Sequence, residues 1–206
     1  MEFSLFYFSG DGSTTNRDKY RLLIEGAKFA DRHGLAAVWI PERHFDAFGG
    51  LYPNPAVAGA AIAALTDNIQ IRSGSVVMPL QDPLRVAEEW AMVDNLSQGR
   101  VGLSFAPGWH PNDFVLCPAK YADKKEIMWR DIQVFQRLWQ GESIELIGGN
   151  GKSVSINTFP RPLQPQVPIW ITSLSDESFI EAGKIGANIL TSPLYQSLDE
   201  ILRKIT

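Results

Sequence analysis

The chain has 206 residues, of which 45% are hydrophobic and 20% charged, so it is long enough to bury one sizeable core, as a globular protein does. The net charge of −4, without any basic cluster, argues against nucleic-acid binding. No apolar run approaches the roughly 20 residues that span a bilayer, and no basic leader precedes the first strand, so we expect a cytoplasmic protein without a membrane partner.

Strands and helices alternate in the predicted order of elements. A first strand at residues 3–8 is followed by a helix that we expect to begin at an Asn16 cap and to end at Gly34, since glycine tolerates the left-handed turn after a helix. Asp82 and Pro83 are typical of the cap and first turn of another helix, which ends at Gly99. The other elements of this part are strands at 36–40, 69–78 and 101–105 and helices at 55–65 and 124–139.

This alternation is interrupted once. Residues 144–147 and 154–156 flank a Gly-Gly-Asn-Gly turn, which predicts a β-hairpin, and the prolines that follow predict an extended connector. We interpret residues 142–168 as an insertion within a single domain that covers residues 1–206. Strands at 169–171 and 187–191, a helix from Ser175 to Ile185 and a last helix at 198–205 complete the predicted elements.

The spacing of the strands predicts a parallel barrel. Strand starts near residues 3, 36, 69 and 101 recur about every 33 residues, which fits successive βα units. A doubly wound sheet is the alternative, but the first βα turn, at residues 9–13, lacks the glycine pattern that holds a dinucleotide pyrophosphate. We therefore expect an α/β fold of the TIM (β/α)8 type with about six βα units, whose exposed strand edges would favour self-association as a homo-oligomer.

The candidate catalytic residues follow the predicted strands. In a parallel barrel the carboxyl ends of the strands share one mouth, so residues after different strands should face a single cavity. His44 is the acid/base candidate, because the unperturbed pKa of histidine lies near neutrality and Glu42 and Arg43 could orient its ring. Arg43 could instead pair with Glu42 or bind an anion. His110 is a second candidate, with a solvated surface histidine as the alternative.

A phosphate site is predicted at the same mouth. Ser175 and Ser178 lie at the start of a helix directly after a strand, where hydroxyls and free backbone N–H groups suit a phosphate monoester. Ser175 could equally be a plain cap, with Asp176 and Glu177 repelling an anion. The single cysteine, Cys117, and the lack of paired histidines argue against a metal, and Gly-x-Ser-x-Gly is missing. An aromatic-rich mouth with these groups favours an organic cofactor.

Several motifs, taken in order, resemble one family. They are the strand ending Trp-x-x-Glu-Arg-His-Phe at residues 39–45, Asn54-Pro55, Val77-Met78-Pro79 with Asp82-Pro83, Asn95-Leu96-Ser97-Gln98-Gly99-Arg100, Ala106-Pro107-Gly108-Trp109-His110-Pro111, and Ile171-Thr172-Ser173 leading to Ser175-Asp176-Glu177-Ser178. Together, over nearly the whole chain, they are similar to the bacterial luciferase-like monooxygenases. The similarity is greatest to the branch found beside or within nonribosomal peptide and polyketide assembly lines.

The resemblance implies a TIM barrel that binds reduced FMN, or in sister groups the deazaflavin F420, at the carboxyl end of the strands. It implies a monooxygenase that oxygenates an acyl or aminoacyl intermediate of natural-product biosynthesis, with a flavin reductase as partner and a carrier protein or assembly-line synthase as a further partner. F420-dependent hydride transfer and a noncatalytic flavin-binding barrel are the alternatives.

The resemblance also assigns site residues by position. Gly74 and Ser75 would form the family's non-proline cis peptide beneath the flavin ring, and Trp109 would line the cofactor site. The phosphate contacts would come from Ser173, Ser175 and Ser178, and the catalytic set would be His44, Arg43 and His110.

Two positions depart from the family pattern. The luciferases carry a Glu-His-His string after strand two, and its first histidine is Arg43 here. The arginine that they offer to the phosphate after strand four is Pro107 here, so phosphate binding would depend on the helix after strand five or on residues beyond Thr206. Family members are typically longer, so we expect a shortened or partial barrel.

Overall fold

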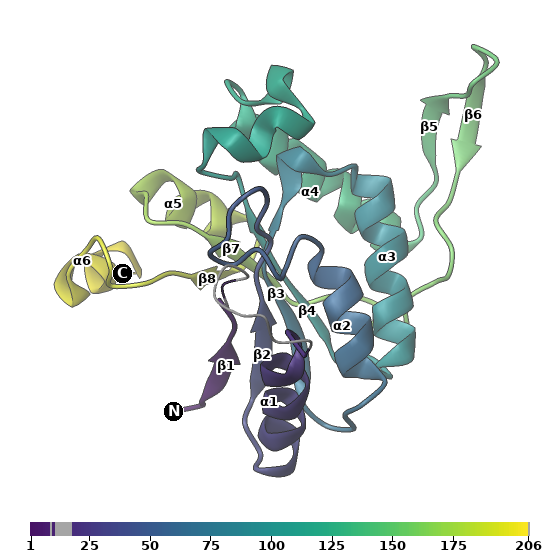
Figure 1. Cartoon of the computed structure of the whole chain (residues 1–206). Helices are drawn as coiled ribbons and strands as arrows, with labels where there is room; N and C mark the ends of the chain where they lie inside the picture. Colours follow the sequence, from purple (N-terminus) through teal and green to yellow (C-terminus); the bar gives the residue numbers. More distant parts are fainter. Residues whose placement is uncertain (9, 11–17, 206) are drawn as a thin grey trace.

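The structure is a computed structural model that describes residues 1–8, 10 and 18–205. Its centre is a sheet of six parallel strands, and strands adjacent in the sheet follow one another along the chain (Figure 1). Across the sheet they are β1 (Ser4–Phe6), β2 (Ala37–Ile40), β3 (Gln70–Val77), β4 (Val101–Ala106), β7 (Ile169–Thr172) and β8 (Asn188–Leu190). This order, with parallel pairing throughout, is that of a (β/α) barrel and differs from a doubly wound sheet, whose strand order reverses.

The sheet is strongly curved. Trp39 on β2 and Trp170 on β7 are in edge-to-face contact with ring centroids 5.2 Å apart, although β3 and β4 lie between their strands. In a flat sheet, strands three places apart would be separated by about 14 Å. The guanidinium of Arg72 lies 5.1 Å from the Trp39 ring and 4.5 Å from the Trp170 ring. The prediction of a partial TIM-type barrel is confirmed, because the six strands form its curled wall.

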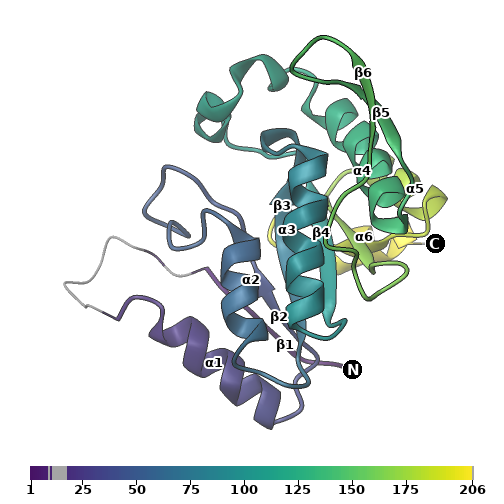
Figure 2. The same ribbon diagram turned by 90° about the vertical axis from the view of Figure 1, so that its right-hand side faces the viewer.

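Four helices cover the outer, convex face of this wall and bury the main core against it (Figure 2). They are α1 (Arg21–Arg32), α2 (Pro55–Ala63), α3 (Pro83–Leu96) and α4 (Lys124–Gln140). On α4 the side chains of Met128, Ile132 and Phe135 recur at spacings of four and three residues, as expected for a helix with one buried face. The Phe135 ring packs edge-on against Phe105 of β4, with centroids 5.3 Å apart.

Local sequence signals set most of the helix ends. The predicted Asp82 cap of α3 is confirmed, since its Oδ1 accepts a hydrogen bond from the Leu84 N–H at 2.9 Å. The predicted start of the first helix is wrong: α1 begins at Arg21 with Tyr20 at the cap position, and Asn16 lies outside the described residues. The Tyr20 hydroxyl donates to the Leu51 carbonyl at 2.9 Å, which ties this helix end to the loop after β2.

Shorter elements follow the strands at their carboxyl ends. The strand predicted to reach Met78 ends at Val77, because a 3-10 turn, η1 (Met78–Leu80), begins there. Two more such turns, η2 (Pro111–Leu116) and η3 (Pro118–Lys120), follow β4, and helices α5 (Asp176–Lys184) and α6 (Leu198–Ile205) follow β7 and β8. None of the helices in the described ranges is both long and apolar enough to cross a membrane.

The predicted hairpin is confirmed as the antiparallel pair β5 (Ile144–Ile147) and β6 (Ser153–Ile156), which projects from the body of the protein (Figure 1). The connector after it is fixed to α3 by the buried Asp94. This carboxylate accepts hydrogen bonds from the backbone N–H groups of Leu163 and Gln164 at 2.7 and 3.0 Å. The insertion therefore returns to the sheet through a polar anchor on the helical layer.

Buried polar contacts also tie the amino-terminal ends of the strands together. Arg100, which precedes β4, donates hydrogen bonds to the carbonyls of Ser97, Ile69 and Thr66, each at 2.7 Å. Asp31 at the end of α1 accepts hydrogen bonds from the backbone N–H groups of residues 67–69. In a TIM-type barrel this end is usually concerned with stability, and chemistry belongs to the opposite end.

Candidate functional site

The carboxyl ends of four strands are joined by direct side-chain contacts. Glu42 after β2 reaches the end of β3, where its Oε2 accepts a hydrogen bond from the Val77 N–H at 2.7 Å. Arg43 after β2 lies under the Trp109 ring after β4, with its guanidinium carbon 5.2 Å from the ring centroid. Thr172 at the end of β7 bonds to Ser75 of β3. The strand ends therefore meet at one end of the wall, but they do not share one cavity, since Arg43 and His44 line one cavity while Gln81 and Asp82 line another.

His44 is held by a buried carboxylate. Its Nε2 lies 2.8 Å from Oε1 of Glu42, whose side chain is fully buried. The same carboxylate accepts hydrogen bonds from the Val77 N–H and from Nε2 of Gln81, at 2.7 and 2.6 Å. Because the carboxylate already accepts from two other N–H groups, we treat it as an acceptor toward His44 as well. In a neutral His44 the proton is therefore assigned to Nε2, and Nδ1 carries the lone pair. A base at this position would therefore act through Nδ1.

Arg43 does not pair with Glu42, contrary to one of the two predicted alternatives. Glu42 is already occupied by its three N–H donors, and Nη2 of Arg43 instead donates to Oδ2 of Asp46 at 2.8 Å. The backbone N–H of Phe48 and then the Arg43 guanidinium hold the pKa of Asp46 below its usual range. In the same loop, Phe45 has a φ of 51°, an unusual conformation for a bulky side chain.

His110 lies on the rim of this region. It occupies the cap position of η2, where its Nδ1 accepts a hydrogen bond from the Asn112 N–H at 3.3 Å. Its ring also packs edge-on against Trp109, whose indole covers the Arg43 guanidinium. The structure thus brings His110 near the Arg43–Asp46 pair, while one of its ring nitrogens supports the local turn.

Hydroxyl groups gather on the concave face between β3, β4 and β7. Oγ of Ser104 and Oγ1 of Thr172 lie 2.7 Å apart, and Ser75 also bonds to Thr172. Next to this cluster, the Gly74–Ser75 peptide is confirmed as cis, and the pairing of β3 with β4 shifts register there. The Ser73 hydroxyl bridges the irregularity, since it accepts from the Ser104 N–H at 2.8 Å and donates to the Ser104 carbonyl at 3.0 Å.

A second hydroxyl group follows at the start of α5. Ser175 is its cap residue, its N–H donates to Oγ of Ser173 at 3.0 Å, and its own Oγ donates to Oγ of Ser178 at 3.0 Å. The charges of Asp176 and Glu177 are offset by neighbouring cations: Lys204 and Arg203 lie 3.4 Å from Asp176, and Lys125 lies 3.5 Å from Glu177. Three hydroxyls therefore gather at a helix start, where backbone N–H groups that lack a partner within the helix suit an anion.

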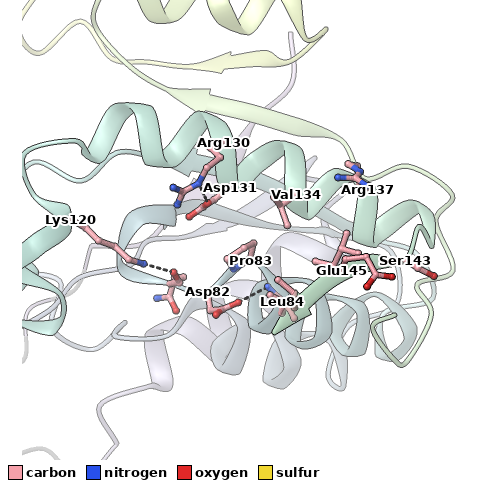
Figure 3. A pocket seen from close by; sticks show the side chains of 13 residues that line it. Asp82, Pro83, Leu84, Lys120, Arg130, Asp131, Val134, Arg137, Ser143 and Glu145 are labelled. Atoms are coloured by element: carbon pink, nitrogen blue, oxygen red, sulfur yellow. Dashed lines mark hydrogen bonds and ion pairs between the residues drawn. The ribbon is translucent and has the colours of Figure 1, made fainter. Parts of the chain in front are cut away.

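Two cavities lie near the strand ends. The larger, of about 630 Å³, lies between the start of α3, helix α4 and the hairpin (Figure 3). Its lining mixes cations and acids, namely Lys120, Arg130, Arg137, Asp82, Asp131 and Glu145. The smaller, of about 420 Å³, is lined by Arg43, His44 and Phe45 together with residues of the loop after β2. We assign the candidate site to the smaller cavity, because it contains the oriented imidazole and the buried guanidinium.

Sequence reasoning missed several of these contacts. Asp46 and Ser104 were not singled out, and Gln81 and Thr172 were considered only as parts of longer segments. For Gln81 and Thr172 the position at or just after a strand end was the available signal. The contacts of Gln81, Ser104 and Thr172 join different strands, whereas Asp46 binds Arg43 within the loop after β2. Within the described ranges, no group of three or more His, Cys, Asp or Glu side chains could hold a metal ion.

The family profile described as luciferase-like monooxygenase matches residues 1–205. The chain therefore belongs to the luciferase-like monooxygenases, as its motifs predicted. Among curated proteins it is similar to the oxygenase component of the flavin-dependent trigonelline monooxygenase of Acinetobacter baylyi, with 31% identity over 206 residues, which cover 98% of this chain and 57% of the relative.

Solved structures share the fold. The monooxygenase RslO1 of Streptomyces bottropensis superposes with a TM-score of 0.89 and 24% identity, covering 99% of this chain and 63% of RslO1. The oxygenating constituent of 3,6-diketocamphane monooxygenase from Pseudomonas putida, in complex with FMN, superposes with a TM-score of 0.78 and 19% identity. The match covers 93% of this chain and 57% of that protein. An F420-dependent secondary alcohol dehydrogenase superposes with a TM-score of 0.72 and 18% identity, and the match covers 99% of this chain and 64% of the dehydrogenase. The chain thus spans 57–64% of the length of these proteins.

Proposed function

We propose that this chain forms the cofactor-binding part of a flavin-dependent monooxygenase that uses reduced FMN and oxygen to oxygenate a small organic molecule. The observation that carries the proposal is the Glu42–His44 pair, which holds an imidazole at the edge of a cavity at the strand-end face of the barrel wall. Membership in the luciferase-like monooxygenases supports flavin and oxygen as the reagents. The chain spans 57% of the length of its curated relative, so the activity of a whole protein of that length is proposed here as well.

The residues of this chain would have distinct roles. Ser173, Ser175 and Ser178 would bind the phosphate of FMN, and the Gly74–Ser75 peptide would lie beneath its ring. Bound reduced FMN supplies the electrons that activate oxygen. His44 would accept or return a proton on the substrate through Nδ1, while Glu42 holds its ring. Stacked rings at the rim, Phe6, Phe8 and Phe48, would limit the access of water.

A flavin reductase is the proposed partner. The relative from Acinetobacter baylyi is named as an oxygenase component, which supports a separate supplier of reduced flavin. The other predicted partners, a carrier protein or an assembly-line synthase, stay predictions. So does the acyl or aminoacyl intermediate of natural-product biosynthesis as substrate, and so do the catalytic roles of Arg43 and His110 and the cofactor contact of Trp109.

Two alternatives have support of their own. F420-dependent hydride transfer is supported by the shared fold of an F420-dependent alcohol dehydrogenase. A noncatalytic flavin-binding barrel is supported by the open sheet, whose outer strands β1 and β8 each pair with a single neighbour within the described residues.

The test measures cofactor binding and oxygenation separately. Reduced FMN and reduced F420 are titrated anaerobically, with quenching of tryptophan fluorescence as the signal, and tighter binding of reduced FMN is expected. A flavin reductase and ¹⁸O₂ are then supplied with trigonelline as the probe, and product labelled with one ¹⁸O atom is expected. Preference for F420 would favour hydride transfer. Flavin binding without any labelled product would favour the noncatalytic barrel.

A matched pair of histidine variants links the activity to the site. His44→Asn should lower the rate of labelled product about 10²-fold, which is typical for the loss of a general acid or base. His33→Asn changes an exposed histidine at the end of α1, whose Nδ1 contacts the Phe29 carbonyl, and should leave the rate unchanged. Equal rates for the two variants would contradict the role given to His44.

A further inference from the structure

Arg43 is a buried cation whose hydrogen-bonding capacity is only partly used. The residue is 8% exposed, and its Nε is buried without a hydrogen-bond partner. Within the described part of the chain, its guanidinium donates a single hydrogen bond, from Nη2 to Oδ2 of Asp46. Because unpaired donors of a buried guanidinium cost free energy, this group favours a second acceptor.

The surroundings of Arg43 fix its position. Asp46 holds Nη2, and Oδ1 of the same carboxylate accepts a hydrogen bond from the Phe48 N–H at 2.9 Å. Gly49 packs against the stem of the arginine, where an added Cβ would come within 3.1 Å of Arg43 Cγ. The loop after β2 therefore fixes the position of the guanidinium, so binding a ligand would cost less conformational entropy.

The cavity beside Arg43 has a mixed lining. Its 420 Å³ lie within the range of small-molecule sites, and His44 and Phe45 line it together with Arg43. The Phe45 side chain is 63% exposed. Trp109, which covers the guanidinium from the other side, is also largely exposed. A ligand in this space meets the Arg43 cation, the His44 imidazole, the Phe45 ring and the Asp46 carboxylate, which is already paired with Arg43.

We infer that Arg43 binds the carboxylate of a small aromatic carboxylic acid, whose ring contacts Phe45 within the cavity that His44 lines. A planar guanidinium fits a carboxylate with paired hydrogen bonds, and aromatic side chains suit a planar ring. This inference rests on the proposed function and specifies its substrate class. It differs from a tethered acyl substrate, because a thioester has no free carboxylate at that carbon.

The inference is tested by binding alone, without flavin or oxygen. Calorimetric titration of the purified protein compares benzoate, benzamide and a benzoyl thioester of N-acetylcysteamine. Benzoate is expected to bind about tenfold or more tightly than benzamide, because a hydrogen bond between two charged groups is stronger than one to a neutral amide. Equal affinity for benzoate and benzamide, or tighter binding of the thioester, would overturn the inference.

Variants assign the preference to Arg43. Arg43→Gln should bind benzoate and benzamide equally, while Arg85→Gln, an exposed arginine paired with Glu88 and Glu89 on α3, should keep the preference. If Arg43→Gln does not fold, Arg43→Lys should weaken benzoate about threefold or more and leave benzamide unchanged, because lysine lacks the planar fork. An undiminished preference for benzoate over benzamide in either Arg43 variant contradicts the inference. The titration with reduced FMN involves no carboxylate substrate, so it can succeed when these titrations fail, and the two proposals fail separately.

Discussion

Nε2 of His44 lies 2.8 Å from the buried carboxylate of Glu42, and this contact decides which nitrogen of the imidazole carries the proton. Glu42 is fixed in turn by Val77 and Gln81, which belong to the end of β3 and the turn after it. The orientation of a residue after β2 therefore depends on the neighbouring strand. Such supporting contacts commonly set the tautomer of functional histidines.

Replacing this carboxylate by an amide tests the arrangement. Glu42→Gln keeps the shape but lets an amide N–H face Nε2, so we expect His44 to lose its preference for the Nε2–H tautomer. Nitrogen-15 NMR of the imidazole measures this directly, and the oxygenation rate should fall about tenfold or more. Glu89→Gln on α3 is the control. An unchanged tautomer in Glu42→Gln would contradict the assignment.

The hydroxyls at the start of α5 should distinguish flavins by their phosphate. Ser178→Ala removes the acceptor of the Ser175 hydroxyl, and we expect it to weaken FMN about fivefold, the equivalent of one ordinary hydrogen bond. Riboflavin, which has no phosphate, should bind the variant and the unchanged protein alike. Ser153→Ala, in the hairpin, is the control. An equal loss for both flavins would argue against a phosphate contact.

Gly74 has no room for a side chain. A Cβ there would lie 2.9 Å from two ring atoms of Phe6 and 3.3 Å from Cβ of Trp39. Gly74→Ala should therefore destabilise the protein by about 1–3 kcal/mol, as overpacking typically does, and urea unfolding measures this. Gly149→Ala is the matched control, since nothing lies within 4 Å of its added Cβ. Equal unfolding midpoints for the two variants would contradict the prediction.

Arg100 should matter for stability rather than for activity. Arg100→Met leaves the buried carbonyls of Ser97, Ile69 and Thr66 without their donor, so we expect a loss of about 3 kcal/mol or more in the free energy of unfolding. Arg137→Met removes an exposed arginine of α4 and should cost little. Similar unfolding free energies for both variants would disprove the structural role of Arg100.

Asp31 should give part of the stability a dependence on pH. Partial burial alone would raise the pKa of Asp31, but hydrogen bonds from the N–H groups of Ile69, Asn68 and Asp67 outweigh burial and lower it. A lowered pKa stabilises the fold above the unfolded value, near pH 4, and this stability is lost as the pH falls through the folded value.

The comparison of Asp31→Asn with the unchanged protein tests this sign. The variant should unfold at lower urea concentration at pH 7, and its midpoint should change less between about pH 5 and pH 3. Glu25→Gln, which removes an exposed ion pair with Lys28, is the control. A variant as sensitive to acid as the unchanged protein would show that Asp31 is not the responsible group.

The sequence predicted the order of elements well, because apolar periodicity and caps such as Asp82 are local signals. It also predicted that His44 and the serines of α5 would lie at one end of the barrel, since parallel strands with regular spacing require this. It did not predict that Arg43 pairs with Asp46. Nor did it single out Gln81, whose contact with Glu42 depends on how β2 and β3 are aligned. The Gln81 contact depends on the register between strands, and the Arg43–Asp46 pair depends on the path of the loop after β2; a single sequence specifies neither.

The edge contact of Trp39 with Trp170 gives this protein an optical signature. Two indoles at 5.2 Å couple their strong electronic transitions, so far-ultraviolet circular dichroism should contain a split band that a flat or loosened wall would lack. The intensity of this band would change with the curvature of the sheet, and its measurement needs no added label. The same band would show whether polypeptide that pairs with the outer strands increases or decreases the curvature of the sheet.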